Sequence, residues 1–318
     1  MGLQQLYTTQ TAGKTRKSSI ESVLQDERFT SILSEDTIRG LLMDVDTNIR
    51  LSDVILSNEN KRKLKTFLIE NENRAELLKY NLRPLNRILC YGASGCGKTF
   101  MAKALSNEMG YTMLYVDIAQ SLSQGKVAIN LTNVFKLATV GKCMIFLDEC
   151  DSIAWNRDSN TPDSADMRRA TNSLFQLMDQ LTFDSMIICA TNMLNRLDPA
   201  FERRFDLKMQ FSRPSLDLVQ SVQHFKKDGF ILINDVPDDE LLTIKSRLKT
   251  NTKLSYYEIE SLTERAMKRA IITKTTVERN NKRQYAIHLR WIIDELKVTL
   301  NIKRSFKTDL EEVEAYNN

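Results

Sequence analysis

A glycine-rich stretch, YGASGCGKT, lies between an apolar run at residues 87–91 and a segment with a helical pattern. Within it, Gly92, Gly97, Lys98 and Thr99 fit the pattern G-x-x-x-x-G-K-[ST]. Glycines in such a loop let backbone N–H groups face phosphates, while the lysine reaches the β- and γ-phosphate oxygens and the hydroxyl binds Mg²⁺. The stretch therefore predicts a nucleotide-phosphate site; the alternative is a glycine-rich turn that binds nothing.

The nucleotide is expected to contact both the loop and the first turn of the following helix. The residues in question are Gly92, Ser94, Gly95, Cys96, Gly97, Lys98, Thr99 and Phe100.

Two carboxylates follow a second apolar run, CMIFLDE, at residues 143–149. In α/β sheets, ligands bind beyond the carboxyl ends of the strands, where Asp148 and Glu149 are expected to lie. We predict that Asp148 belongs to the Mg²⁺ site and that Glu149 is the general base that polarises the attacking water. Taken alone, an apolar run that ends in Asp-Glu is a common strand terminus, and its position after the glycine-rich loop strengthens the prediction.

Polar residues near two further strands complete the candidate site. Asn192 follows the apolar run at 186–190 and can hydrogen-bond the γ-phosphate or the attacking water, unless it is a simple turn asparagine. Arg203 and Arg204 precede the expected last strand, Leu207 to Phe211. An isolated arginine pair is usually a solvated face, so its meaning depends on the surrounding motifs.

The elements that must position these residues follow from the spacing of apolar runs. Runs typical of strands occur at 87–91, 112–117, 143–148 and 186–190, separated by helical segments, and this alternation predicts a parallel α/β sheet. With the last strand, the sheet has five strands and flanking helices. After residue 213 runs typical of strands nearly vanish, and the pattern predicts helices over residues 215–300, with turns near 235–237 and 251–252.

We therefore predict three parts of the chain. Residues 1–50 form a polar N-terminal arm with short helices, residues 51–212 form the P-loop domain, and residues 213–318 form a helical lid domain with a C-terminal extension.

Composition narrows the class of protein. The sequence has no apolar run of about 18 residues and no secretion signal, so we expect a cytoplasmic protein. Its five cysteines form no C-x-x-C pair, and with two histidines no zinc cluster can be assembled at ligand spacing. The net charge of +4 comes from basic residues interspersed with acidic ones, which supports a nucleic-acid partner only weakly.

Five segments in this order resemble the AAA+ ATPase superfamily and, within it, the AAA group of standalone bacterial ATPases. The resemblance runs from about Leu51 to about Ala270, through LSDVILSNENKRKL, YGASGCGKT, CMIFLDECDSIA, ICATN and LDPAFERRFD. It implies ATP and Mg²⁺ as cofactors, with Asp53 and Val54 beside the adenine. It also implies a homo-oligomeric ring, expected to be a hexamer, in which Arg203 and Arg204 reach the γ-phosphate of a neighbouring subunit.

The chain departs from the family pattern in the lid. The family places a Gly-Ala pair against the nucleotide at the start of a helix, whereas Tyr256 and Tyr257 stand at those positions here. Ser255 fits the N-cap of that helix. One of the tyrosines packs on the adenine, or both pack within the lid.

A second departure concerns the central pore. Members that thread polypeptides carry an aromatic residue in the first pore loop, whereas Ser123 and Gln124 occupy the matching positions here. Leu122 or Lys126 can contact a substrate instead, and Trp155 can line the pore or pack structurally. The resemblance therefore implies a ring that does not thread polypeptides strongly.

Two hypotheses about the role follow. The first is an ATP-driven ring that remodels a partner protein. The second is a nucleotide-dependent regulator that resets a partner, such as a protease or nuclease, or a loader that acts on nucleic acid. Similar small ATPases are encoded beside effectors, including subtilisin-like proteases, in bacterial anti-phage systems. No protease, nuclease or metal motif occurs in the chain, so a partner must supply any such chemistry.

Overall fold

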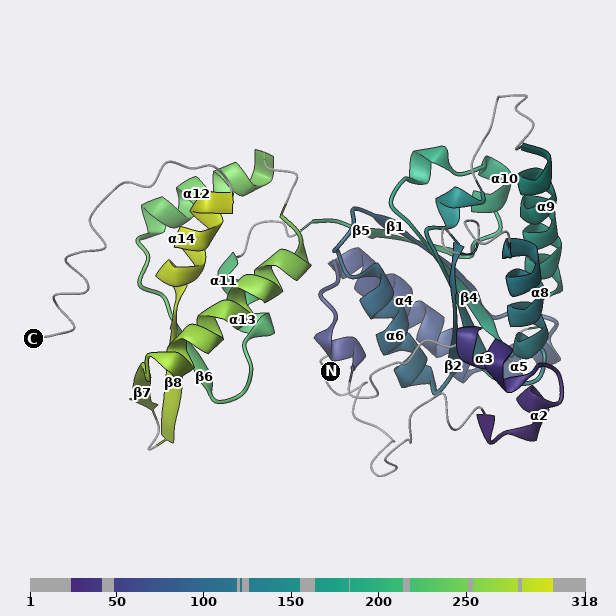
Figure 1. Cartoon of the computed structure of the whole chain (residues 1–318), viewed down its shortest axis with the longest axis horizontal. Coiled ribbons are helices and arrows are strands. Elements are labelled where there is room, and N and C mark those ends of the chain that lie inside the picture. The colour runs from purple at the N-terminus through teal and green to yellow at the C-terminus, as the bar shows by residue number, and fades with distance from the viewer. Residues whose placement is uncertain are drawn as a thin grey trace, which may run out of the picture. The chain divides into compact units, whose positions relative to one another are not determined.

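The computed structural model of the chain divides between Ser212 and Arg213 into two compact units (Figure 1). The residues that it describes are 24–41, 49–118, 121, 126–154, 164–182, 184–213, 218–250, 254–279 and 282–299. Among them, no helix is both long enough and apolar enough to cross a bilayer.

The first unit is built on a five-stranded parallel sheet with the strand order β2-β3-β4-β1-β5. The strands are β1 (Arg87–Gly92), β2 (Thr112–Asp117), β3 (Cys143–Asp148), β4 (Met186–Thr191) and β5 (Leu207–Phe211). The predicted five-stranded parallel sheet is confirmed. Its strands are nearly continuous apolar runs because helices cover both faces, so residues of both alternating sets are buried.

Helices cover the two faces of this sheet (Figure 1). They are α4 (Asn58–Glu72), α5 (Arg74–Lys79), α6 (Lys98–Met109), α8 (Val127–Ala138) and α9 (Ser164–Gln180). Neighbouring strand residues pack on opposite sides: Ile187 lies in one hydrophobic cluster with residues of α8 and α9, and Ile188 lies in another with residues of α4 and α6. The sheet is therefore rigidly held from both faces.

Two short helices near the N-terminus join the first of these clusters. In α2 (Glu27–Thr30) Phe29 is buried, and in α3 (Glu35–Leu41) Ile38 is buried, both in the cluster that contains α8 and α9. Residues 24–41 therefore pack on the first unit and contribute Phe29 and Ile38 to its core.

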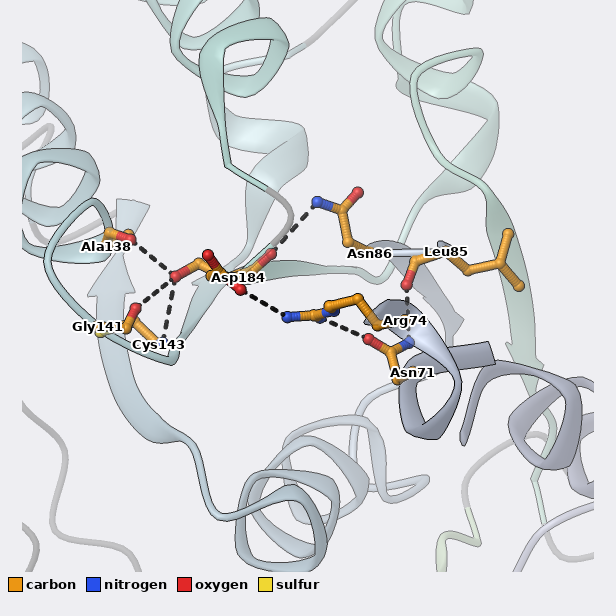
Figure 2. A network of polar contacts seen from close by, with 9 residues as sticks. Asn71, Arg74, Leu85, Asn86, Ala138, Gly141, Cys143 and Asp184 are labelled. Carbon is orange, nitrogen blue, oxygen red and sulfur yellow. Dashed lines mark hydrogen bonds and ion pairs between the residues drawn. The ribbon is translucent and has the colours of Figure 1, made fainter. Parts of the chain in front are cut away.

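A polar network ties α4 and α5 to the edge of the sheet where the strands begin (Figure 2). Arg74 of α5 donates to Asp184, at 3.4 Å, and to the side-chain oxygen of Asn71, at 2.7 Å. Asn71 in turn donates to the carbonyl of Leu85, just before β1, at 2.9 Å. The start of β1 is thereby fixed to the helices that cover it.

The buried hydroxyl of Ser185 makes further hydrogen bonds at this end of the strands. It lies 2.7 Å from the carbonyl oxygen of Ala138 and 2.8 Å from that of Gly141, and it accepts a hydrogen bond from the N–H of Cys143. These contacts join the end of α8 to the starts of β3 and β4. They therefore help to fix these two strands relative to each other.

The second unit contains the predicted helices, but the prediction of a helical domain is wrong for residues 230–233, 276–279 and 282–288, which form a small sheet. Its helices are α11 (Leu218–Phe225), α12 (Asp238–Thr250), α13 (Tyr256–Ile272) and α14 (Leu289–Thr299). Its strands are β6 (Phe230–Ile233), β7 (Thr276–Arg279) and β8 (Lys282–His288), in the order β6-β8-β7.

The sequence pattern concealed this sheet for a physical reason. β7 and the outer half of β8 are solvent-exposed and carry charged residues, and in β8 only Ala286 and Ile287 are buried. β6 has four residues, and its parallel partner β8 lies some 50 positions later in the chain. Short, partly exposed strands with distant partners leave no long apolar run to recognise.

Candidate functional site

The predicted site residues gather where the strands of the parallel sheet end. β3, β4 and β1 are neighbours in the sheet, so the residues that follow them lie side by side at one edge. Gly92 ends β1, Asp148 ends β3 and Thr191 ends β4. Parallel α/β sheets bind ligands at such an edge.

The loop between β1 and α6 depends on its glycines. Gly92 has a φ of 138°, and a Cβ atom at this position would lie 2.0 Å from the carbonyl oxygen of Phe211 in β5. Gly97 has a φ of 94° and caps α6, which begins at Lys98. The backbone therefore turns sharply from strand to helix, and the first N–H groups of α6 face the loop.

Lys98 is buried, with 7% of its surface exposed. Its Nζ donates to the carbonyl oxygens of Gly92 (2.7 Å) and Ala93 (3.0 Å) and to Oδ1 of Asn192 (2.8 Å). Burial lowers the pKa of Lys98, and the carboxylates of Asp148 and Asp151 oppose this shift. The ammonium group is thus held at the centre of the loop with three oxygen partners.

Thr99 and Asp148 bring two oxygen donors together. The hydroxyl of Thr99 donates to Oδ2 of Asp148 at 3.3 Å. Mg²⁺ prefers oxygen ligands and is commonly held by one or two carboxylates together with phosphate oxygens and water. The described residues contain no cluster of three or more His, Cys, Asp or Glu side chains that would hold a metal ion alone. The Thr99–Asp148 pair fits a cation that arrives with phosphates.

Glu149 leaves the sheet in an uncommon backbone conformation. Its φ is 52° and its ψ is 41°, in the left-handed region that non-glycine residues rarely adopt. Its side chain is exposed, its N–H donates to Oδ1 of Asp148 at 3.0 Å, and a short helical turn, η3 (Cys150–Ser152), follows. This turn places an exposed carboxylate directly beside Asp148.

The sequence pattern did not single out two residues that connect this turn to Asn192. The hydroxyl of Thr191 donates to Oδ1 of Asp151 at 2.7 Å and accepts from the N–H of Met193 at 2.9 Å. The available signal was a threonine at the end of an apolar run, directly before Asn192, together with an aspartate two residues after Glu149.

Arg203 and Arg204 lie at the opposite end of the strands, just before β5 begins. They follow the short helix α10 (Pro199–Glu202) and precede β5, which runs parallel to β1 with Leu207 paired to Ile88 and Phe211 paired to Gly92. Residues before β5 therefore lie near the start of β1, whereas the glycine loop lies at its end. Five residues of strand at about 3.3 Å each separate the two edges by about 16 Å.

The two arginines have different surroundings. Arg204 donates to the carbonyl of Ala200 (2.7 Å) and to Asp179 (3.2 Å), and its guanidinium lies 4.3 Å from the ring centroid of Phe175. Arg203 is exposed, and among the described residues its side chain has no hydrogen bond or ion pair. Arg204 is therefore held within its own subunit, while Arg203 is available to another molecule.

The segment expected beside the adenine packs against the glycine loop. Val54 ends a short helical turn, η2 (Leu51–Asp53), and is buried in the same hydrophobic cluster as Cys96, while Asp53 is exposed. Phe100, in the first turn of α6, is 39% exposed. Val54 therefore lies on the face of the sheet that α4 and α6 cover.

The residues predicted at the start of the lid helix lie in the second unit. Ser255 caps α13 through a hydrogen bond from the N–H of Glu258, which confirms the predicted N-cap. Tyr256 and Tyr257 open that helix in the second unit, where Tyr257 is 70% exposed, and their contact with the nucleotide stays a prediction.

Of the residues predicted for the pore region, Lys126 is exposed directly before α8, and its contact with a substrate stays a prediction. The predictions for Leu122, Ser123, Gln124 and Trp155 lie outside the described residues.

Known proteins share this arrangement. Residues 88–213 match the family described as ATPase family associated with various cellular activities (AAA). The chain is 32% identical over 170 residues to the uncharacterized AAA family ATPase y4kL of Sinorhizobium fredii, which covers 53% of this chain and 51% of that protein. It is 28% identical over 242 residues to the 26S proteasome regulatory subunit 4 homolog of Saccharomyces cerevisiae, covering 72% and 53%.

The chain thus spans about half the length of these two curated relatives. Among solved structures, the crystal structure of the FIGL-1 AAA domain matches with a TM-score of 0.58 and 19% identity, over 96% of this chain and 95% of that one. That likeness concerns the fold. Taken with the glycine loop, the paired carboxylates and the parallel sheet, the family match and the sequence relatives show that residues 88–213 form an AAA ATPase domain.

Proposed function

We propose that this protein binds ATP with Mg²⁺, hydrolyses it within a ring of identical subunits, and uses the cycle to remodel or regulate a partner protein. The observation that carries the proposal is the hydrogen bond between Lys98 and Asn192, beside the Thr99–Asp148 pair. The strand order makes the ends of β1, β3 and β4 neighbours, and the two contacts lie at those ends, where we propose that the phosphates bind.

Each residue at this edge has a role in the proposed reaction. Lys98 binds the β- and γ-phosphate oxygens as their main side-chain cation, and the N–H groups at the start of α6 bind the phosphates from the backbone. Thr99 and Asp148 hold Mg²⁺, which when bound neutralises charge on the phosphate oxygens. Glu149 accepts a proton from the attacking water, and Asn192 orients that water or the γ-phosphate.

The separation between the glycine loop and Arg203, at opposite ends of the strands, supports a ring. Because about 16 Å of strand lies between the glycine loop and the start of β5, Arg203 does not reach the nucleotide of its own subunit. An exposed arginine with no partner among the described residues of its own subunit is suited to stabilise charge on a γ-phosphate in the next subunit. We propose six subunits, as the family resemblance implies.

The partner is a protein in our proposal, in line with the relative whose name identifies it as a regulatory subunit of the 26S proteasome. The resemblance to small ATPases of anti-phage systems points to an effector protease as the specific partner. All five cysteines are buried and none forms a disulfide bond, and buried thiols of this kind are typical of a reducing compartment such as the cytoplasm. Co-purification of a hydrolase that depends on this chain for activity would support the regulatory role.

Replacement of the proposed base tests the reaction itself. In Glu149→Gln the side chain keeps its size and its hydrogen bonding but loses the base, so ATP turnover falls by about a hundredfold or more while ATP still binds. Lys98→Ala, in contrast, weakens ATP binding because the phosphates lose their main side-chain cation. Steady-state phosphate release and binding of a fluorescent ATP analogue measure the two effects. Wild-type turnover by Glu149→Gln would refute the assignment of the base.

An unfolding assay separates regulation from polypeptide threading. A stable fluorescent fusion protein is mixed with the ATPase, ATP and a trap that captures unfolded chains. We expect little or no loss of fluorescence, because Ser123 and Gln124 offer little apolar area to grip a moving chain. Rapid ATP-dependent unfolding would instead favour a threading motor.

A further inference from the structure

A buried hydroxyl connects the two polar strand ends of the site. Thr191 is 1% exposed, so its hydroxyl must find partners within the protein. It donates to Oδ1 of Asp151 at 2.7 Å and accepts from the N–H of Met193 at 2.9 Å. Both sides of the hydroxyl are therefore engaged, and its orientation is fixed.

These two hydrogen bonds fix the backbone on either side of Asn192. The bond from Met193 closes a turn whose middle residue is Asn192, and the bond to Asp151 anchors that turn to the segment after Glu149. Asn192 is itself exposed and directs its Oδ1 to Lys98 at 2.8 Å. The position of an exposed side chain in the site thus depends on a buried neighbour.

The segment that carries Asp151 is held from other directions too. The carbonyl of Ile153 accepts from the hydroxyl of Thr171 in α9 at 2.6 Å. The carbonyl of Ala154 accepts from the N–H of Asp198 at the start of α10 at 2.8 Å. The hydroxyl of Thr191 therefore meets an acceptor with a fixed position, as precise placement of a reacting group requires.

From these contacts we infer that Thr191 and Asp151 are positioning residues, whose hydrogen bond sets Asn192 and Glu149 at the correct separation around the attacking water. The inference rests on the proposed ATP hydrolysis. Neither residue is assigned contact with phosphate. Their pairing acts on the transition state through Asn192 and Glu149, because an error of about 1 Å in such placement can cost about a hundredfold in rate.

The first test removes only the hydroxyl. Thr191→Val has nearly the same shape but cannot donate to Asp151 or accept from Met193. We expect kcat to fall about tenfold or more while the KM for ATP stays within about threefold, because Lys98 and the glycine loop are unchanged. Thr191→Ser keeps the hydroxyl and restores kcat to within about threefold of wild type.

Variants of the acceptor test the same bond from the other side. Asp151→Asn keeps an oxygen acceptor and retains most of kcat, whereas Asp151→Ala lowers kcat as Thr191→Val does. Because the Thr191–Asp151 bond is already absent from each single variant, the double variant Thr191→Val/Asp151→Ala should lose no more than Thr191→Val alone. Multiplied losses in the double variant would overturn the pairing.

A matched control separates positioning from stability. Thr263 in α13 is also fully buried and donates to the carbonyl of Ile259 at 2.8 Å, but it lies in the second unit. Thr263→Val removes the same kind of hydroxyl and should leave kcat per bound nucleotide analogue unchanged. A fall in kcat for Thr191→Val that merely matches its loss of folded, nucleotide-binding protein would refute the inference.

The two proposals fail in different ways. Absence of ATP hydrolysis by the wild-type chain would refute the proposed function and this inference with it. Active wild-type protein together with Thr191→Val at wild-type kcat would refute the inference alone.

Discussion

Lys98 and Asn192 are joined by a hydrogen bond of 2.8 Å between Nζ and Oδ1, although 94 positions separate them in the chain. The other two donors of the Lys98 ammonium are engaged by carbonyls of the glycine loop. A phosphate that binds Lys98 must therefore share or replace one of these three oxygens, and the amide oxygen of Asn192 is the one that belongs to a side chain. Asn192 is consequently placed to respond to the presence of phosphate.

Removal of this amide should affect turnover more than binding. For Asn192→Ala we expect kcat to fall about ten- to a hundredfold, with ATP affinity within about threefold of wild type, because Lys98 and the loop still bind the phosphates. The matched control is Asn195→Ala, which changes an exposed asparagine three residues later. Equal effects of the two variants would show that Asn192 has no special role.

Alanine variants of the two arginines should differ in their effects on stability and on ATP hydrolysis. Arg203→Ala should leave the melting temperature unchanged but cut hydrolysis about a hundredfold or more, since its exposed side chain acts on a neighbouring subunit. Arg204→Ala should also lower stability by about 1 kcal/mol, because it loses its contacts with Asp179 and Phe175. Calorimetry and phosphate release measure the two quantities.

Mixed rings test whether Arg203 acts between subunits. Arg203→Ala subunits have an intact Glu149, and Glu149→Gln subunits have an intact Arg203. Rings that contain both should recover part of the activity that each lacks alone. No recovery in rings shown to be mixed would contradict action on the neighbouring site.

Two glycines of the loop should respond differently to alanine. Gly92→Ala brings a Cβ to 2.0 Å from the carbonyl oxygen of Phe211 and also imposes an unfavourable φ, so it should cost about 3 kcal/mol or more. Gly97→Ala has open space around the new Cβ and only the unfavourable φ, so about 1 to 2 kcal/mol is expected. Urea denaturation measures both. Equal costs would mean that the β1–β5 contact is unimportant.

Glu240 should make the stability of the second unit depend on pH. Arg290 Nη1 lies 2.7 Å from both carboxylate oxygens, and Lys297 also donates to Glu240. Although burial opposes the shift, these hydrogen bonds hold the pKa of Glu240 below its ordinary value of 4.5. The resulting stabilisation is complete above pH 4.5 and is lost as the pH falls through the folded-state pKa.

The variant Glu240→Gln isolates this effect. It should cost about 1 to 2 kcal/mol at pH 7, and the difference from wild type should shrink as the pH falls below 4.5. The chain has two tryptophans, and Trp291 lies in α14. Unfolding can therefore be followed through Trp291 in a Trp155→Phe background. A difference that does not change with pH would exclude this ion pair as its source.

Much of the first unit could be predicted from the sequence, because its information is local. Each strand of the large sheet is buried on both faces and therefore appears as an apolar run, and the five predicted strands match β1 to β5. The glycine loop was recognisable because the left-handed φ of Gly97 and the close approach of Gly92 to Phe211 admit essentially no other residue.

Contacts between distant segments were decided only by the tertiary structure. The strand order puts β4 between β3 and β1, and this order alone brings Asn192 to Lys98 and Thr191 to Asp151. The same structure separates two adjacent arginines, because packing against Phe175 engages Arg204 and leaves Arg203 exposed. Such pairings join residues far apart in the chain, so no local sequence pattern reveals them. The apolar run of a buried strand, in contrast, can be recognised from a few consecutive residues.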